Sequence, residues 1–130
     1  MKLRSSIPPE CPKSSEPVHG EIEVLRLVEG PNVSLEDFKS WFELHGYERS
    51  AKCRCMNYGL SVWGIQCDLN RLRDLWKYPQ LREKTSIARI RLTPASGLLD
   101  SIKQAKDGHA CFWLGENFDP VRATIGVEDL

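Results

Sequence analysis

The strongest periodicity in the chain lies between Ser34 and Gly46, where apolar side chains recur every three or four residues. On one face of a helix this spacing gathers Leu35, Phe38, Trp41, Phe42 and His45. Ser34 is a residue type that caps helix N-termini, and Gly46 suits the left-handed position at which many helices end. The aromatic residues carry more apolar area than a short helix can hide alone, so we expect this helix to lie on a sheet.

Alternation of period two predicts the strands of that sheet. Glu21–Glu29 has β-forming residues on both of its faces, which is typical of an interior strand. Tyr47–Met56 and Leu60–Gln66 alternate on either side of a short turn and together predict a hairpin. The further strands predicted are Ser86–Leu92, His109–Leu114 and a short edge strand at Val121–Val127.

Two more helices are predicted from their capping residues. Asp68 can cap a helix that ends at Pro79. Its apolar face would hold Leu69, Leu72, Leu75 and Trp76. Thr93 and Pro94 can begin a third helix, which ends at Gly108. Its apolar face would hold Leu98, Leu99, Ile102 and Ala105.

The predicted order of elements is β-α-β-β-α-β followed by α-β. The first six elements resemble, in outline, the split β-α-β arrangement of ferredoxin-like folds. We therefore expect an α+β fold in which residues 21–127 form a single domain, with the helices packed on one face of a mainly antiparallel sheet. Residues 1–20, rich in Pro and Ser, are expected to form an arm that is ordered only where something docks it, and residues 128–130 are expected to fray.

Composition limits the classes of function. The chain has 130 residues, and its 18 basic side chains balance 18 acidic ones, so no overall field attracts nucleic acid or an anionic membrane. No apolar run has the length of a membrane span or of a signal peptide, and we expect a cytoplasmic protein. An odd number of cysteines, five, favours free thiols over a disulfide framework. No motif indicates a cofactor.

Basic residues occupy alternate positions of two predicted strands, Lys52 with Arg54 and Arg89 with Arg91, and Arg26 could join them. If helices cover one side of the sheet, these side chains would gather on the open side, where guanidinium groups bind phosphate or carboxylate. The alternative is that they only solvate an exposed face. With two tryptophans that could line such a site, the predicted ligand-binding residues are Arg54, Trp63, Arg89, Arg91 and Trp113.

Nucleic-acid binding is a more specific form of the anion-binding hypothesis, because RNA-binding sheets stack bases on aromatic side chains of their open face. The aromatic and glycine signature of such strands is missing here, and the net charge is zero. Nucleic acid is therefore disfavoured as a partner.

Cysteine and histidine form a second group. Cys53 with Cys55, and His109 with Cys111, would each share a strand face and could place four soft ligands around one zinc ion. The spacing is not that of a zinc knuckle, and buried thiols are the commoner role, so no metal is expected. His109 is the one credible catalytic base, since it begins a strand that could aim it at a pocket.

These patterns favour a small binding module without catalytic activity, which uses the open sheet face for a protein partner or a small anionic ligand. A homodimer paired through its sheets is also expected, because four tryptophans exceed what one small core usually needs. The alternative is an enzyme resembling the dimeric α+β barrel group, with His109 as its acid or base.

Overall fold

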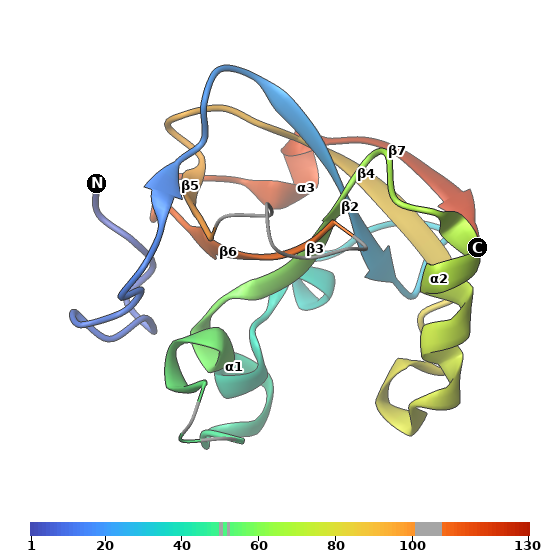
Figure 1. The fold of residues 1–130 in the computed structure, drawn as a ribbon, viewed down its shortest axis with the longest axis horizontal. Helices are drawn as coiled ribbons and strands as arrows, with labels where there is room; N and C mark the ends of the chain where they lie inside the picture. The colour runs from blue at the N-terminus through green and yellow to red at the C-terminus, as the bar shows by residue number, and fades with distance from the viewer. Residues whose placement is uncertain (50, 52, 101–107) are drawn as a thin grey trace.

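The computed structural model describes residues 1–49, 51, 53–100 and 108–130, and within these an α+β fold is confirmed (Figure 1). Seven described strands form one sheet in the order β1-β5-β6-β3-β2-β4-β7, with antiparallel pairing throughout. The strands are β1 (Glu16–Pro17), β2 (Ile22–Val28), β3 (Leu60–Gly64), β4 (Ser86–Leu92), β5 (Gly97–Leu99), β6 (His109–Leu114) and β7 (Thr124–Asp129). The described α-helices are α1 (Trp41–His45), α2 (Leu69–Asp74) and α3 (Pro120–Ala123), and the 3-10 helices are η1 (Leu35–Phe38), η2 (Arg54–Tyr58), η3 (Leu75–Lys77) and η4 (Pro79–Leu81).

Helices cover both faces of the sheet, so the predicted packing on one face is wrong. One face, which we call the α3 face, packs against Phe38 of η1 and Val121 of α3. Its buried strand residues include Val24, Val62, Ala88, Ile90 and Phe112. The opposite face, the α2 face, packs against Leu72 of α2. Its buried strand residues include Leu25, Leu27, Trp63 and Ile87. Consecutive residues of β2 are buried, as in Val24 and Leu25, and an interior strand with two apolar faces needs cover on both.

The predicted helix from Ser34 to Gly46 is interrupted. It divides into η1 and α1, because Lys39 has an extended backbone with φ −91° and ψ 139°. Ser40 begins the second segment as a true cap: its hydroxyl accepts the Glu43 amide at 3.2 Å, and the Glu43 carboxylate accepts the Ser40 amide at 2.9 Å. The apolar spacing continues through this break, which is why it predicts one helix.

The predicted hairpin before β3 is also wrong. Residues 54–58 form η2, and the neighbours of β3 are β2 and β6. The Asn57 side chain stabilises this turn by donating to the Arg54 carbonyl at 2.8 Å and accepting the Arg49 amide at 2.9 Å. The ferredoxin-like order is not confirmed, since its second strand is this 3-10 turn.

The predicted helix from Thr93 is replaced in its first half by a turn and a strand. Ser96 accepts the Thr93 amide at 2.8 Å through its hydroxyl, and its own amide donates to the Thr93 carbonyl at 2.9 Å. The chain then forms β5, which pairs with β6. The second half of the predicted helix falls on residues 101–107, outside the described residues. In contrast, the strands β2, β3, β4 and β6 and the helix that begins after Asp68 are confirmed. The edge strand predicted at Val121–Val127 is confirmed only from Thr124 onward, because Pro120–Ala123 form α3.

Both ends of the chain are held by the sheet. In the expected arm, β1 pairs with β5, Leu3 bridges to Gly115, and the side chains of Ile7 and Cys11 are buried. The arm is therefore docked on the fold. The expected fraying of residues 128–130 is wrong, because β7 extends to Asp129 and the Leu130 amide donates to the Thr85 carbonyl at 2.9 Å.

Candidate functional site

The predicted ligand-binding residues do not form one site. Arg89 and Arg91 are exposed on the α2 face of β4, as the alternation predicts. Trp63 and Trp113 are buried on the same face of the sheet, in two different clusters. Arg54 lies on η2, outside the sheet. Two of the five residues thus share an exposed surface.

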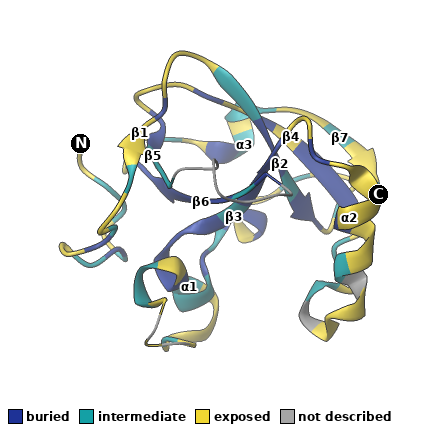
Figure 2. Ribbon diagram, in the orientation of Figure 1, coloured by how far each residue is buried: buried dark blue, intermediate teal, exposed yellow. Residues whose placement is uncertain are grey.

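That surface contains a cavity of about 280 Å³ between α2 and the strands β2, β4 and β7. Leu25, Cys67 and Ile87 supply its buried apolar residues. Around them stand three large apolar side chains with substantial exposure: Ile65 at 51%, Leu69 at 39% and Ile125 at 44%. Arg89, Gly126, Glu128 and Asp129 complete the lining. Figure 2 shows exposed residues along both α2 and β7. We call the group Ile65, Leu69, Arg89 and Ile125 the β7 patch.

A second cavity, of about 660 Å³, adjoins the first at Ile65, which lines both. It lies where β2 begins and β3 ends, and its described polar residues are Glu21, Glu23, Gln66 and Arg91. Arg91 is engaged there, because its Nε lies 3.0 Å from a carboxylate oxygen of Glu21. Acidic and basic groups therefore alternate along this surface, and it lacks the uniform positive charge that an anion-binding sheet needs.

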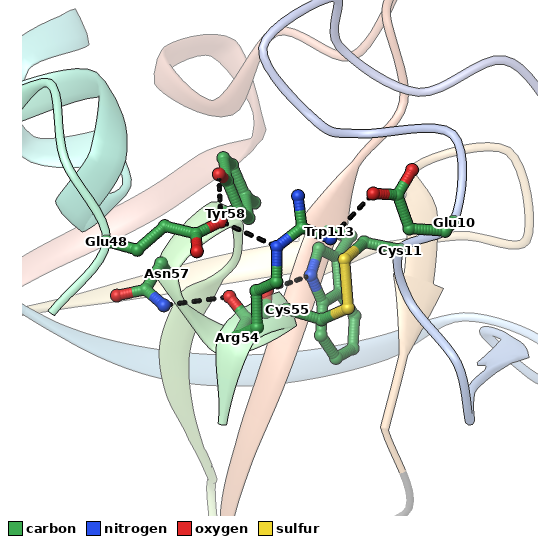
Figure 3. Close-up of a disulfide and its surroundings, with 8 residues drawn as sticks. All are labelled: Glu10, Cys11, Glu48, Arg54, Cys55, Asn57, Tyr58 and Trp113. Carbon is green, nitrogen blue, oxygen red and sulfur yellow. Dashed lines mark hydrogen bonds and ion pairs between the residues drawn. A yellow bond between two sulfur atoms is a disulfide. The ribbon is translucent and has the colours of Figure 1, made fainter. Parts of the chain in front are cut away.

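Arg54 links the docked arm to η2 (Figure 3), and with Trp113 it lines a third cavity, of about 230 Å³. Its Nη1 donates to Glu10 at 2.6 Å and its Nε to Glu48 at 2.8 Å. The hydrogen bond to Glu10 raises the pKa of Arg54, and a hydrogen bond donated to Glu48 raises the pKa of Tyr58. Because both carboxylates are engaged by the same guanidinium, Arg54 acts as a connector between two segments distant in the sequence.

The cysteines do not form the candidate zinc site. Cys55 is joined to Cys11 by a disulfide, and the Trp113 indole donates to the Cys55 carbonyl at 2.9 Å beside it (Figure 3). Cys53 is exposed, and Cys111 is buried, which raises the pKa of the Cys111 thiol to about 12. Among the described residues, no three His, Cys, Asp or Glu side chains are grouped to hold a metal ion. The expectation of free thiols is wrong for Cys11 and Cys55. A disulfide is typical of oxidising compartments, and the cytoplasmic location stays a prediction.

His109, the candidate catalytic base, is the first residue of β6 and lies on the α2 face beside Trp63. Its ring stacks on Trp63 with centroids 4.9 Å apart, and its Nε2 lies 3.0 Å from the hydroxyl of Ser61. A hydroxyl beside an imidazole is the pairing that activates serine nucleophiles. The described lining residues of the cavities above include neither of the two.

Arg26, which alternation places with Val24 and Val28, is half-buried on the α3 face rather than part of a basic surface. Its Nε donates to the Asp37 carbonyl and its Nη1 to the Ser61 carbonyl, each at 2.8 Å. Burial lowers the pKa of Arg26 to about 10, so the side chain stays charged at neutral pH. Lys52, the remaining member of the predicted basic set, lies outside the described residues. The basic sheet face is thereby reduced to Arg89 and Arg91.

Among the described helices, none has the length and apolar character needed to cross a membrane. Comparison of the chain with protein-family models, with curated proteins and with solved structures finds no match.

Proposed function

We propose that this protein is a binding module that recognises a segment of another protein at the β7 patch. The observation that carries this proposal is the convergence of Ile65, Leu69 and Ile125, which remain 51%, 39% and 44% exposed around one apolar cavity. They come from two distant parts of the chain, the segment from the end of β3 to the start of α2 and the strand β7. Single exposed apolar residues are ordinary on a protein surface, whereas a group around a concave apolar floor is typical of an interaction site.

The charges around the β7 patch support a polypeptide partner more than a small anion. Arg89 forms no ion pair with a described residue, but Glu128 and Asp129 line the same cavity. Arg91 is already paired with Glu21. A mixed polar rim around an apolar centre is the usual anatomy of a protein interface, while a small anion is held best where basic groups converge without acids.

A display library of random 12-residue peptides, selected on the immobilised protein, tests this proposal. We expect enriched peptides to lose about tenfold or more in affinity for Leu69→Asp and Ile125→Asp, because a carboxylate at either position must be desolvated in the complex. Leu44→Asp is the matched control, since Leu44 is 50% exposed on α1 and lines neither cavity. Peptides that bind all three variants as they bind the wild type, or no enrichment at all, would contradict the proposal.

A second candidate function, acid–base chemistry at His109, is favoured by the 3.0 Å approach of its Nε2 to the Ser61 hydroxyl. A fluorophosphonate, which labels activated serines, is the direct probe. Labelling of Ser61 that disappears in His109→Ala would support this candidate. An unlabelled wild-type protein would remove it and leave the pair as a structural hydrogen bond.

A further inference from the structure

The strand β7 lies at the end of the sheet and presents unpaired backbone on its outer side. Within the described part of the chain it pairs with β4 and with no other strand. The Leu130 amide donates to the Thr85 carbonyl at 2.9 Å, and the register continues with Ser86 opposite Asp129. Hydrogen-bonded and non-bonded pairs alternate in an antiparallel ladder, so the N–H and C=O groups of Val127 and Asp129 point away from β4.

This edge has few of the features that protect edge strands from pairing. The segment TIGVED contains neither Pro nor Lys, the residues that most often block an edge. A register shift does occur in the ladder with β4, between Arg89 and Ile90, and two carboxylates close the strand at Glu128 and Asp129. The outer backbone of β7 is thus open to an added strand, and the two carboxylates favour an added strand that carries positive charge.

The outer edge and the apolar cavity are continuous. Ile125, Gly126, Glu128 and Asp129 of β7 line the cavity of about 280 Å³, with Leu69 of α2 also at its rim. In a sheet, side chains on one face of neighbouring strands lie about 5 Å apart, so a strand added to β7 would bring its own side chains beside Ile125 and Glu128. A long apolar side chain at that position can enter the cavity.

We propose that the partner segment binds as an extended strand added to the outer edge of β7, with an apolar side chain in this cavity and a Lys or Arg beside Glu128 and Asp129. The inference rests on the proposed function and specifies how the segment binds. Backbone hydrogen bonds provide affinity in this mode, while the cavity and the two carboxylates provide specificity. The β7 strand of a second copy is a poorer occupant, because it offers the same two acids and no basic residue.

Proline at an outward-facing position is the decisive variant. Val127→Pro removes an amide that β4 does not use, so it blocks an added strand while the ladder with β4 is kept. Val127→Ala is the matched control, because it also removes the contacts that the Val127 side chain makes with the core on the α3 face. Asp129→Pro, compared with Asp129→Asn, repeats the test at the second outward amide. Circular dichroism establishes that each variant is folded before its binding is measured.

Using peptides enriched from the random 12-residue library on the wild-type protein, we expect alternating apolar and basic sequences that bind Val127→Ala but lose about tenfold or more on Val127→Pro. Equal binding to Val127→Pro and Val127→Ala would overturn strand addition. If the same peptides still depend on Leu69, that outcome leaves the proposed function intact. Light scattering of the peptide-free proteins tests the choice of occupant. A wild type that is a dimer, with a Val127→Pro variant that is a monomer, would show that the occupant is a second copy of the chain.

Discussion

The guanidinium of Arg26 on β2 donates from Nη1 to the backbone oxygen of Ser61 on the neighbouring strand β3, at 2.8 Å. The ladder between these two strands is short, with Val24 opposite Gly64 and Leu25 opposite Trp63. Beyond it, the half-buried side chain of Arg26 supplies a hydrogen bond between the two strands in place of a backbone one. Since Nε also donates to the Asp37 carbonyl of η1 at 2.8 Å, one residue joins two strands and the element that covers the α3 face.

Arg26→Met is therefore expected to lower the free energy of unfolding by about 2 kcal/mol, because two partly buried carbonyl oxygens lose their donor. Arg26→Lys should lose less stability, since one ammonium can still donate a hydrogen bond to one of the two carbonyl oxygens. Urea unfolding measures both values. Arg122→Met, at an exposed arginine of α3, is the control and should change stability by less than about 0.5 kcal/mol. Equal stability of the Met variants at 26 and 122 would show that the guanidinium of Arg26 is dispensable for stability.

The disulfide between Cys11 and Cys55 fixes the docked arm to η2. It closes a segment with a sequence separation of 44 residues, for which loop-closure entropy predicts a stabilisation of about 4 kcal/mol. We expect the double variant Cys11→Ser with Cys55→Ser to unfold at lower urea concentration than the wild type.

A thiol reductant gives the matching measurement. It should shift the wild type to the unfolding midpoint of the double variant and leave that variant unchanged. Cys53→Ser keeps the disulfide, because Cys53 is an exposed free cysteine, and it should behave like the wild type with and without reductant. A wild type whose midpoint is insensitive to reductant would contradict this prediction.

The accuracy of the sequence predictions depended on whether a local pattern allowed more than one backbone. Ser86–Leu92 and His109–Leu114 were predicted to the residue, because strict alternation and clear flanking signals leave little besides a strand. The prediction of one continuous helix over Ser34–Gly46 is wrong because Ser40 suits two positions. It can be a polar residue on the outer face of a helix or the N-cap of a new helix, and the structure has it as an N-cap. Nothing in the spacing of the apolar residues distinguishes these roles.

In the candidate site, contacts between residues far apart in the sequence could not be predicted either. Alternation placed Arg89 and Arg91 on one exposed face, as found. Arg54 has the same local pattern, yet its partner Glu10 lies 44 residues earlier, and an ion pair over that distance leaves no periodic signal. The exposure of the Leu69 side chain could not be predicted either, because a leucine on the apolar face of a helix is expected to be buried.

Gly30 is required by the packing of the turn after β2. Its φ of +67° belongs to the left-handed region, and a Cβ built there would lie 2.0 Å from the Ser86 hydroxyl oxygen. Gly46 has a similar φ of +76° but open space around it. Gly46→Ala should therefore cost about 1 kcal/mol for backbone strain alone, and Gly30→Ala clearly more, since Ser86 must also move.

Thermal unfolding of the two alanine variants measures this difference. The double variant Gly30→Ala with Ser86→Ala should recover part of the loss relative to Ser86→Ala alone, because the hydroxyl that clashes is absent. Equal costs at the two glycines would mean that the turn adjusts without strain against Ser86.

Cys111 makes the stability of the fold sensitive to alkaline pH. Burial raises the pKa of its thiol from 9.0 to about 12, so between these values the unfolded chain loses a proton that the folded chain keeps. The unfolded state then binds fewer protons, and the free energy of unfolding falls as pH rises, by at most about 1.4 kcal/mol per pH unit for one group.

Cys111→Ala should be less stable than the wild type at pH 8 because of the cavity it leaves, but its stability should fall less steeply above pH 9. Urea unfolding of both proteins at pH 8, 9.5 and 10.5 isolates the thiol, since Tyr58, whose pKa is also raised, is present in both. Parallel decline of the two proteins would show that Cys111 ionises equally well in the folded state.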